Sequence, residues 1–134
     1  MSDEHEIKDD RLYTKDHEWA SWQSDGVKVG ISAYAVAQLG DVTLVNVDVK
    51  AGDTVHAGTA FGTIESVKTL SDLFAPVSGT VLAVNGSLES KPELVNEDCW
   101  DKGWLIVVAP TDPKDKEKLL SPGAYAELVG TLAH

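Results

Sequence analysis

The sequence predicts a mainly β fold of the sandwich or barrel type, with one short helix near the N-terminus and helices at the C-terminus. The first observation is that glycines divide residues 41–109 into short segments; they stand at positions 52, 58, 62, 79, 86 and 103. Short strands separated by glycine-containing turns are typical of sandwiches and barrels. The second observation is a switch after Ala109 to segments in which proline suits the first position of a helix.

Strands are expected before this region as well. Residues 12–13, 19–22 and 27–31 place β-branched or aromatic side chains at short spacing. Ser24-Asp25-Gly26, between the last two segments, is a typical hairpin turn sequence. We therefore expect an N-terminal strand pair joined by a tight turn and packed beside the main β region.

A short helix is expected directly after these strands. Ser32 suits the N-cap, residues 33–39 are rich in alanine, and Gly40 suits the left-handed backbone that often follows a helix. Two more helices are expected over about 112–130, where an Asp-Pro pair and a Ser-Pro pair can each open a helix.

The chain is expected to form one domain, because 134 residues with 43% hydrophobic side chains can bury a single core. We expect this domain to span residues 12–130, with a β core over about 42–109 and C-terminal helices over about 112–130. Residues 1–11 are rich in charged side chains. We expect them to form a flexible acidic tail.

The charge balance argues against two classes of partner. Eleven Lys and Arg stand against 22 Asp and Glu, a net charge of −11. Nucleic acids and anionic membranes both bind clustered cations, so neither is expected as a partner. Residues 1–11 show no secretory signal, and the apolar run 105–109 is too short to span a bilayer. The single cysteine, Cys99, fits a reducing compartment, so we expect a cytoplasmic protein and favour the bacterial cytosol.

The most informative segment runs from Gly62 to Gly79. Its residues favour two strands that meet near Val67 and Lys68, although no Gly or Asn stands there to demand a turn. Pattern alone would make Lys68 an ordinary solvated lysine.

The segment nevertheless resembles the lipoyl-lysine region of the H protein of the glycine cleavage system. The resemblance rests on the order Glu-Ser-Val-Lys at 65–68, then Ser-Asp at 71–72 and Ala-Pro-Val-Ser-Gly at 75–79. Other motifs match in order over roughly residues 12–130; they are Tyr13-Thr14, His17-Glu18-Trp19, Val29-Gly30-Ile31, Gln38-Leu39-Gly40-Asp41, Pro92-Glu93-Leu94-Val95-Asn96 and Gly103-Trp104-Leu105. Departures from the family pattern occur at Ser32-Ala33, Val36, 46–50 and Cys99-Trp100, all outside the Lys68 segment.

The resemblance implies a lipoyl/biotinyl-type fold, a flattened antiparallel β-sandwich or half-barrel with Lys68 at one end. It also implies that lipoic acid is attached to Lys68 through an amide bond. Glu65, Ser66 and Val67 would be read by the lipoate or octanoate attachment enzyme, although Glu65 can also be a plain cross-strand partner.

The resemblance further implies a carrier that is not itself an enzyme and that we expect to be a monomer. Glycine decarboxylase, a pyridoxal-phosphate enzyme, would load an aminomethyl group onto the lipoyl arm. A tetrahydrofolate-dependent aminomethyltransferase would unload it, and dihydrolipoamide dehydrogenase would reoxidise the arm. Because the loaded group is cationic, carboxylates would suit the cleft that receives it. Glu18 and Asp72 occupy matching positions and are the candidates, against the alternative that both are ordinary solvated acids.

Other functions remain open at this point. An H-like paralogue could act as a lipoate relay or as a lipoyl carrier in another pathway. A biotin carrier resembles Met-Lys-Met, whereas this chain has Val67-Lys68-Thr69, and acyltransferase lipoyl domains usually show Asp-Lys. An independent enzyme, such as a hydrolase that uses Asp or Glu with a histidine, is a second class of function, but no such pair of residues stands out in the sequence. A purely structural β module is a third class. No metal site is expected, because no His or Cys has metal-ligand spacing to another among His5, His17, His56, His134 and Cys99.

Overall fold

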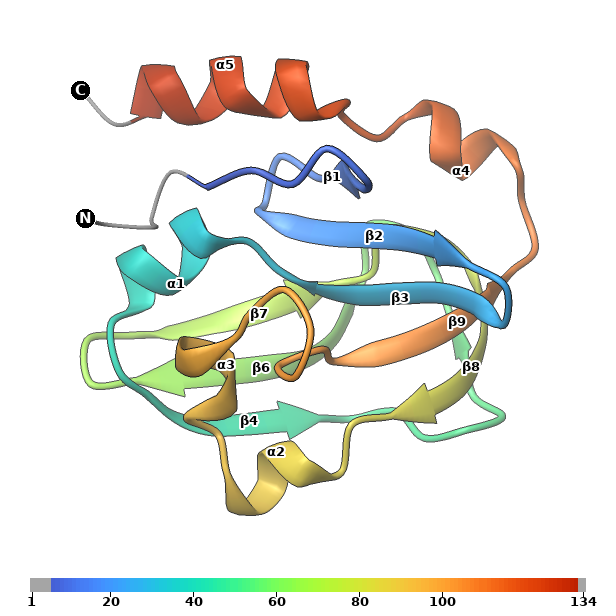
Figure 1. Cartoon of the computed structure of the whole chain (residues 1–134). Coiled ribbons are helices and arrows are strands. Elements are labelled where there is room, and N and C mark those ends of the chain that lie inside the picture. Colours follow the sequence, from blue (N-terminus) through green and yellow to red (C-terminus); the bar gives the residue numbers. More distant parts are fainter. Residues whose placement is uncertain (1–5, 133–134) are drawn as a thin grey trace.

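The computed structural model describes residues 6–132, which fold into two packed sheets (Figure 1). The large sheet has six strands in the order β1-β2-β3-β9-β8-β5, and the small sheet has three in the order β4-β6-β7. Neighbouring strands pair antiparallel throughout. With one helix near the N-terminus and a longer one at the C-terminus, the predicted mainly β class is confirmed.

The elements are short, as the spacing of the turns requires. The strands are β1 (Leu12–Tyr13), β2 (Glu18–Gln23), β3 (Gly26–Ile31), β4 (Val42–Val47), β5 (Thr54–Val55), β6 (Ala60–Ser66), β7 (Leu70–Phe74), β8 (Gly79–Val84) and β9 (Ile106–Pro110). The helices are α1 (Ala33–Leu39), α2 (Ser87–Ser90), α3 (Leu94–Glu97), α4 (Lys114–Glu117) and α5 (Pro122–Leu132).

The N-terminal strands are part of the large sheet. The predicted hairpin is present, since β2 pairs with β3 around the turn that ends at Gly26. β3 then pairs with β9, with Val27 opposite Val108. This differs from the expected strand pair beside a separate β region. Local pattern could not show it, because the pairing joins opposite ends of the chain.

Two single-turn helices, α2 and α3, interrupt the stretch that was expected to be nearly all β. Each buries one apolar side chain, Leu88 in α2 and Val95 in α3. One turn is too short for the helical periodicity to stand out in the sequence. The helix α1 does follow its prediction, because Ser32 caps it and Gly40, at φ +76°, ends it.

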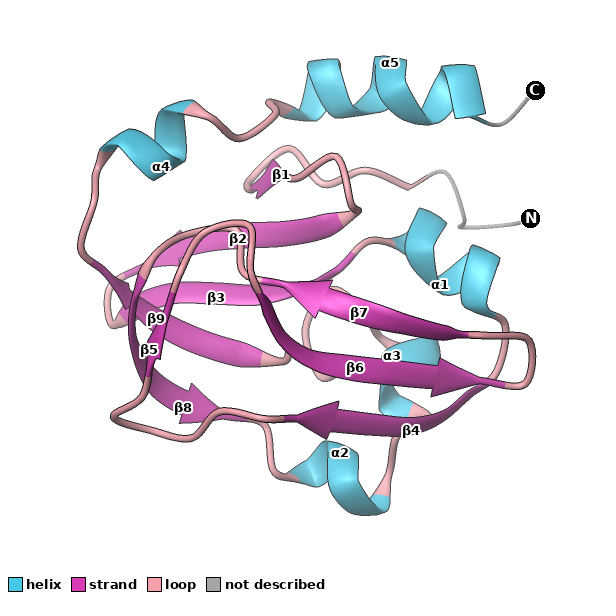
Figure 2. Ribbon diagram, turned by 180° about the vertical axis from the view of Figure 1, so that it is seen from behind, coloured by secondary structure: helices cyan, strands magenta, loops and turns pink. Residues whose placement is uncertain are grey.

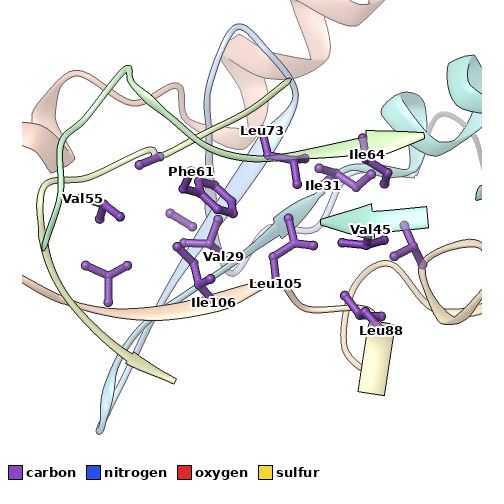
Figure 3. Close-up of a cluster of buried hydrophobic side chains, with 14 of the residues drawn as sticks. Val29, Ile31, Val45, Val55, Phe61, Ile64, Leu73, Leu88, Leu105 and Ile106 are labelled. Atoms are coloured by element: carbon purple, nitrogen blue, oxygen red, sulfur yellow. The ribbon is translucent and has the colours of Figure 1, made fainter. Parts of the chain in front are cut away.

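The main core lies between the two sheets (Figure 3). Val29 and Ile106 come from the large sheet, and Phe61, Ile64 and Leu73 come from the small sheet. All five are at most 1% exposed. Burial of side chains of this size supplies most of the stabilisation and fixes the small sheet over the large one.

A second apolar cluster holds α5 against the N-terminal strands. Tyr125 of α5 stacks on Tyr13 of β1 with ring centroids 4.3 Å apart, and Trp19 and Val129 complete the buried set. The Trp19 Nε1–H donates to the carbonyls of Ile31 and Cys99, at 3.0 and 3.1 Å. The C-terminal helix thus lies beside α1 and β1 rather than apart from the sheets (Figure 1).

Of the tail predicted over 1–11, residues 1–5 lie outside the described residues. Residues 6–11 contact the body of the protein. The Lys8 N–H donates to the Tyr13 hydroxyl at 2.7 Å, and the Arg11 guanidinium lies 4.5 Å from the centre of the Trp19 ring. Among residues 6–132, no helix combines the length and apolar character needed to cross a bilayer.

Candidate functional site

Lys68 lies at the turn that joins β6 to β7, at one end of the molecule (Figure 2). The Ser66 N–H donates to the Thr69 carbonyl at 2.9 Å and closes a turn with Val67 and Lys68 at its centre. The Lys68 side chain is exposed, and Val67 beside it is 67% exposed. A primary amine is therefore presented at the end of a paired hairpin.

The Ser66 side chain makes this turn possible without glycine. Neither Val67 nor Lys68 has a positive φ, whereas the commonest two-residue hairpin turns require one. The Ser66 hydroxyl oxygen instead accepts from the backbone N–H groups of Lys68 and Thr69, both at 3.2 Å. The serine directly before the turn is thus the sequence signal for it, in place of Gly or Asn.

The tip of the hairpin rests on the linker between α1 and β4. The Asp41 carbonyl accepts from the Val67 N–H at 3.0 Å. Gly40 lies beneath the lysine stem, because a Cβ at Gly40 would stand 3.3 Å from Lys68 Cε. The hairpin is therefore anchored close to the lysine as well as along its strands.

Asn96 of α3 holds this linker in place. Its Oδ1 accepts from the Val42 N–H, and its Nδ2 donates to the Gly40 carbonyl, both at 2.8 Å. One amide side chain thus satisfies backbone groups on both sides of Asp41. Sequence reasoning assigned Asn96 no role, because its two partners lie more than fifty positions away in the chain.

A cavity of about 360 Å³ opens along the β6–β7 hairpin. Its lining comprises Asp16, His17, Glu18, Ile31, Tyr34, Ala35, Gln38, Leu39, Ile64, Thr69, Ser71, Asp72, Leu73 and Leu132. Thr69 directly follows Lys68, so the cavity begins within a short reach of the amine. A larger hollow of about 630 Å³ on residues 6–11, α1 and the 96–101 segment borders neither Lys68 nor Glu18.

Glu18 is the buried acid of this cavity, with 2% of its surface exposed. Its Oε1 accepts from the Thr14 hydroxyl at 2.6 Å, and its Oε2 accepts from the Phe74 N–H at 3.2 Å. Burial raises the pKa of Glu18 to about 7, although both hydrogen bonds favour the charged form. Within residues 6–132, no basic side chain forms an ion pair with it. Glu18 therefore borders this cavity without a counter-ion, and it also borders a neighbouring hollow of about 390 Å³ that its partners Thr14 and Phe74 line.

His17 and Tyr125 fix the wall beside Glu18. His17 Nδ1 lies 2.8 Å from the Tyr125 hydroxyl, which lies 2.6 Å from the Ser32 hydroxyl. Burial lowers the pKa of His17 and so favours the neutral ring. The negative charge of Asp16 has a smaller, opposite effect on that pKa. His17 also has a positive φ of 75°. The contact between His17 and Tyr125 could not be predicted from local pattern, because the two residues lie 108 positions apart in the chain.

Asp72 borders the same cavity but differs from Glu18 in burial. It is exposed, and it pairs with Thr63 across β6 and β7. Because strand side chains alternate, Asp72 points to the face opposite to Ser71 and Leu73. The two candidate acids thus both border the cavity, but only Glu18 is buried.

Glu65 lies in the middle strand of the small sheet and is half-buried. Its cross-strand partners are Leu44 on β4 and Leu70 on β7.

In the part of the chain that the structure describes, no three His, Cys, Asp or Glu side chains gather as a metal site would require.

Known proteins resemble this chain over nearly its whole length. A family model described as glycine cleavage H-protein matches residues 11–131. The glycine cleavage system H protein of Anaeromyxobacter sp. (strain K) is 46% identical over 124 residues, which is 92% of this chain and 96% of the relative. That of Rubrobacter xylanophilus is 50% identical over 121 residues, 90% and 93% of the two chains. The crystal structure of a glycine cleavage system H protein from Mycobacterium marinum matches with a TM-score of 0.84 at 39% identity. The match covers 92% of this chain and 99% of that chain.

Replacing Asn96 by alanine should loosen the tip of the hairpin. Asn96→Ala leaves the Gly40 carbonyl and the Val42 N–H without their partner, so the free energy of unfolding should fall by about 2 kcal/mol. Hydrogen exchange at the Val67 N–H should accelerate, because its acceptor, Asp41, lies between these groups. Urea unfolding and amide exchange measured by NMR would check both effects.

The matched control for this experiment is Asn85→Ala. Asn85 likewise joins two backbone groups through its amide, since its Nδ2 donates to the carbonyls of Lys102 and Trp104, and neither partner belongs to the lysine turn or the linker that supports it. It should lower stability without a selective change at Val67. If the Val67 N–H exchanges at the same rate in Asn96→Ala and Asn85→Ala, Asn96 does not hold the linker that supports the turn.

The buried Glu18 should make stability depend on pH. Between the ordinary pKa of a glutamate and about 7, the folded chain holds a proton that the unfolded chain releases, so stability falls as pH rises. Glu18→Gln removes this effect, and its stability relative to the parent should rise by on the order of 1 to 3 kcal/mol from about pH 5 to about pH 8. Denaturant unfolding across that range checks this. The exposed Glu127→Gln should show no such trend, and a flat difference for Glu18→Gln would refute it.

Proposed function

Because the chain belongs to the glycine cleavage H-protein family, we propose that it is the lipoyl carrier of the glycine cleavage system, with lipoic acid attached to Lys68. It shuttles an aminomethyl group from glycine decarboxylase, a pyridoxal-phosphate enzyme, to the tetrahydrofolate-dependent aminomethyltransferase. Dihydrolipoamide dehydrogenase then reoxidises the carrier. The observation that supports this most is an exposed primary amine on a braced hairpin, beside a cavity whose buried acid has no counter-ion.

Attachment requires the Lys68 amine to act as a nucleophile. The uncharged amine attacks the carbonyl of an activated lipoyl or octanoyl donor, an amide bond forms, and the activating group leaves with the bonding electrons. The ammonium gives up one proton to become the attacking amine, which changes the formal net charge from −11 to −12, and the nitrogen gives up a second proton as the amide forms. We propose Glu65, Ser66 and Val67 as the motif that the attachment enzyme reads. Ser66 shapes the turn, and Val67 exposes an apolar side chain next to the amine.

The cavity suits the group that the carrier would return to it. When bound, the lipoyl group would supply a dithiolane whose S–S bond can open, so that one sulfur carries an aminomethyl group, and can re-form on oxidation. Ile64 and Leu73 supply apolar wall that excludes water, and Leu132 of α5 borders the cavity. Glu18 supplies a carboxylate that binds an ammonium group and is relieved of its burial penalty by doing so. Asp72 borders the cavity, but its side chain lies on the exposed outer face of β7, so we propose that it adds negative charge to the surroundings rather than to the interior.

We propose that this chain performs no catalytic step itself, because the partner enzymes carry the reactive groups. Its net charge of −11 would speed encounters with basic surfaces on those partners, and this attraction would weaken as the salt concentration rises. We propose a monomer in the cytosol, as in a bacterial cell, because one arm must visit several enzymes in turn. Contacts with those enzymes should be transient. Nucleic acids and membranes are not proposed as partners.

Intact mass spectrometry tests the attachment. Produced together with a lipoylation system, the chain should gain one lipoyl group, and Lys68→Arg should gain none because a guanidinium does not form the amide. Lys91→Arg, which replaces another exposed lysine, should still gain one. An adduct on Lys68→Arg would contradict the assignment. A lipoylated chain that glycine decarboxylase does not load would instead favour the lipoate relay.

A further inference from the structure

The outer face of the small sheet carries a row of three side chains beside the lysine turn. Leu44 of β4 lies opposite Glu65 of β6, and Glu65 lies opposite Leu70 of β7. Residues in register point to the same face of a sheet, with Cβ atoms about 5 Å apart. The next residues inward, Val45 and Ile64, are buried in the core on the other face. We name Leu44, Glu65 and Leu70 the tip row.

The leucines of the tip row are open to solvent. Leu44 is 45% exposed and Leu70 is 61% exposed. Within residues 6–132, five large hydrophobic side chains are exposed, and three of them, Leu44, Val67 and Leu70, lie around the Lys68 turn. A single exposed leucine is ordinary on a protein surface. Here the exposed leucines gather at one place, in register and next to a nucleophile.

Glu65 gives the tip row a definite chemistry. In the described part of the chain, no basic side chain forms an ion pair with it. It is half-buried between the two leucines, and exposed Asp41 and Asp72 stand on the neighbouring segments. A complementary surface would therefore offer apolar depressions for the leucines and an Arg or Lys for Glu65.

We propose that the enzyme that acylates Lys68 docks on the tip row and recognises Leu44 and Leu70 together with Glu65. This inference rests on the proposed function, in which Lys68 is the attachment site. An enzyme that forms the amide must bring its reacting centre to Lys68 Nζ, so its surface must cover the residues around the turn. Enzymes that act on the far end of the lipoyl arm can work at the arm's length from this face.

The size of the tip row also favours this occupant over a second copy of the chain. A stable dimer buries about 800 Å² on each partner, far more than three side chains supply. A short-lived enzyme contact needs only a few apolar anchors near its centre. Recognition would moreover require the folded sheet, because the three side chains come from three strands.

Attachment kinetics test the proposal on the whole folded chain. The probe is a purified lipoate ligase with lipoate and ATP, and the product is followed by intact mass at varied carrier concentration. Leu44→Thr/Leu70→Thr keeps strand-forming residues, and its kcat/KM should fall by about tenfold or more, mainly through KM. Leu82→Thr is the matched control, because Leu82 is 46% exposed but lies on β8 of the large sheet. It should stay within about twofold of the parent.

A second measurement separates docking from damage to the fold. The double variant, carried to full lipoylation by long incubation, should unfold at the parent temperature and be reduced by dihydrolipoamide dehydrogenase at the parent rate. If it unfolds early, the single Leu70→Thr variant provides the kinetic comparison. Acylation of the tip-row variants at the parent rate, or an equal loss in Leu82→Thr, would overturn the proposal. Failure of the parent chain itself to be acylated would instead overturn the attachment site.

Discussion

A carboxylate enclosed without a basic partner is a costly feature, and the rest of the site is organised around it. Glu18 is 2% exposed, and its only compensation within the described chain comes from hydrogen bonds, including those from Thr14 and the Phe74 N–H. Burial dominates, which is why the pKa of Glu18 is raised to about 7. A group of this kind gains from any cation that enters the cavity, because the cation removes the penalty of the charged form. The same cost would have little purpose in a purely structural module.

The scaffold separates two tasks that a carrier must combine. In the proposed function, the amine of Lys68 has to stand in solvent for attachment, while the cargo would lie near Glu18. The hairpin solves the first task, and its anchoring through Asp41 and Asn96 holds the backbone of the turn from which the lysine stem extends. The second task depends on α5, whose Tyr125 fixes the wall beside the buried acid. Both solutions use contacts between distant parts of the chain.

Local sequence therefore predicted the parts better than their assembly. The cap at Ser32 and the hairpin near Gly26 follow from neighbouring residues, and both are confirmed. Family resemblance, rather than pattern, singled out Lys68, since nothing in its composition distinguishes it from other exposed lysines. The pairing of β3 with β9 and the clamp by Asn96 could not be predicted, because each joins segments that only the folded chain brings together. The turn at Ser66 was predictable in principle from its side-chain chemistry.

The most direct measurement follows the Glu18 carboxyl carbon by NMR as pH is varied. Lipoylated chain labelled with ¹³C would be titrated before and after its arm is loaded with the aminomethyl group. Before loading, the pKa should lie near 7, as burial without a counter-ion requires. After loading, the ammonium group should draw the proton away and lower that pKa toward or below the ordinary range of a glutamate. An identical titration in the two states would show that the cargo does not reach Glu18, and the role given to the cavity would be wrong.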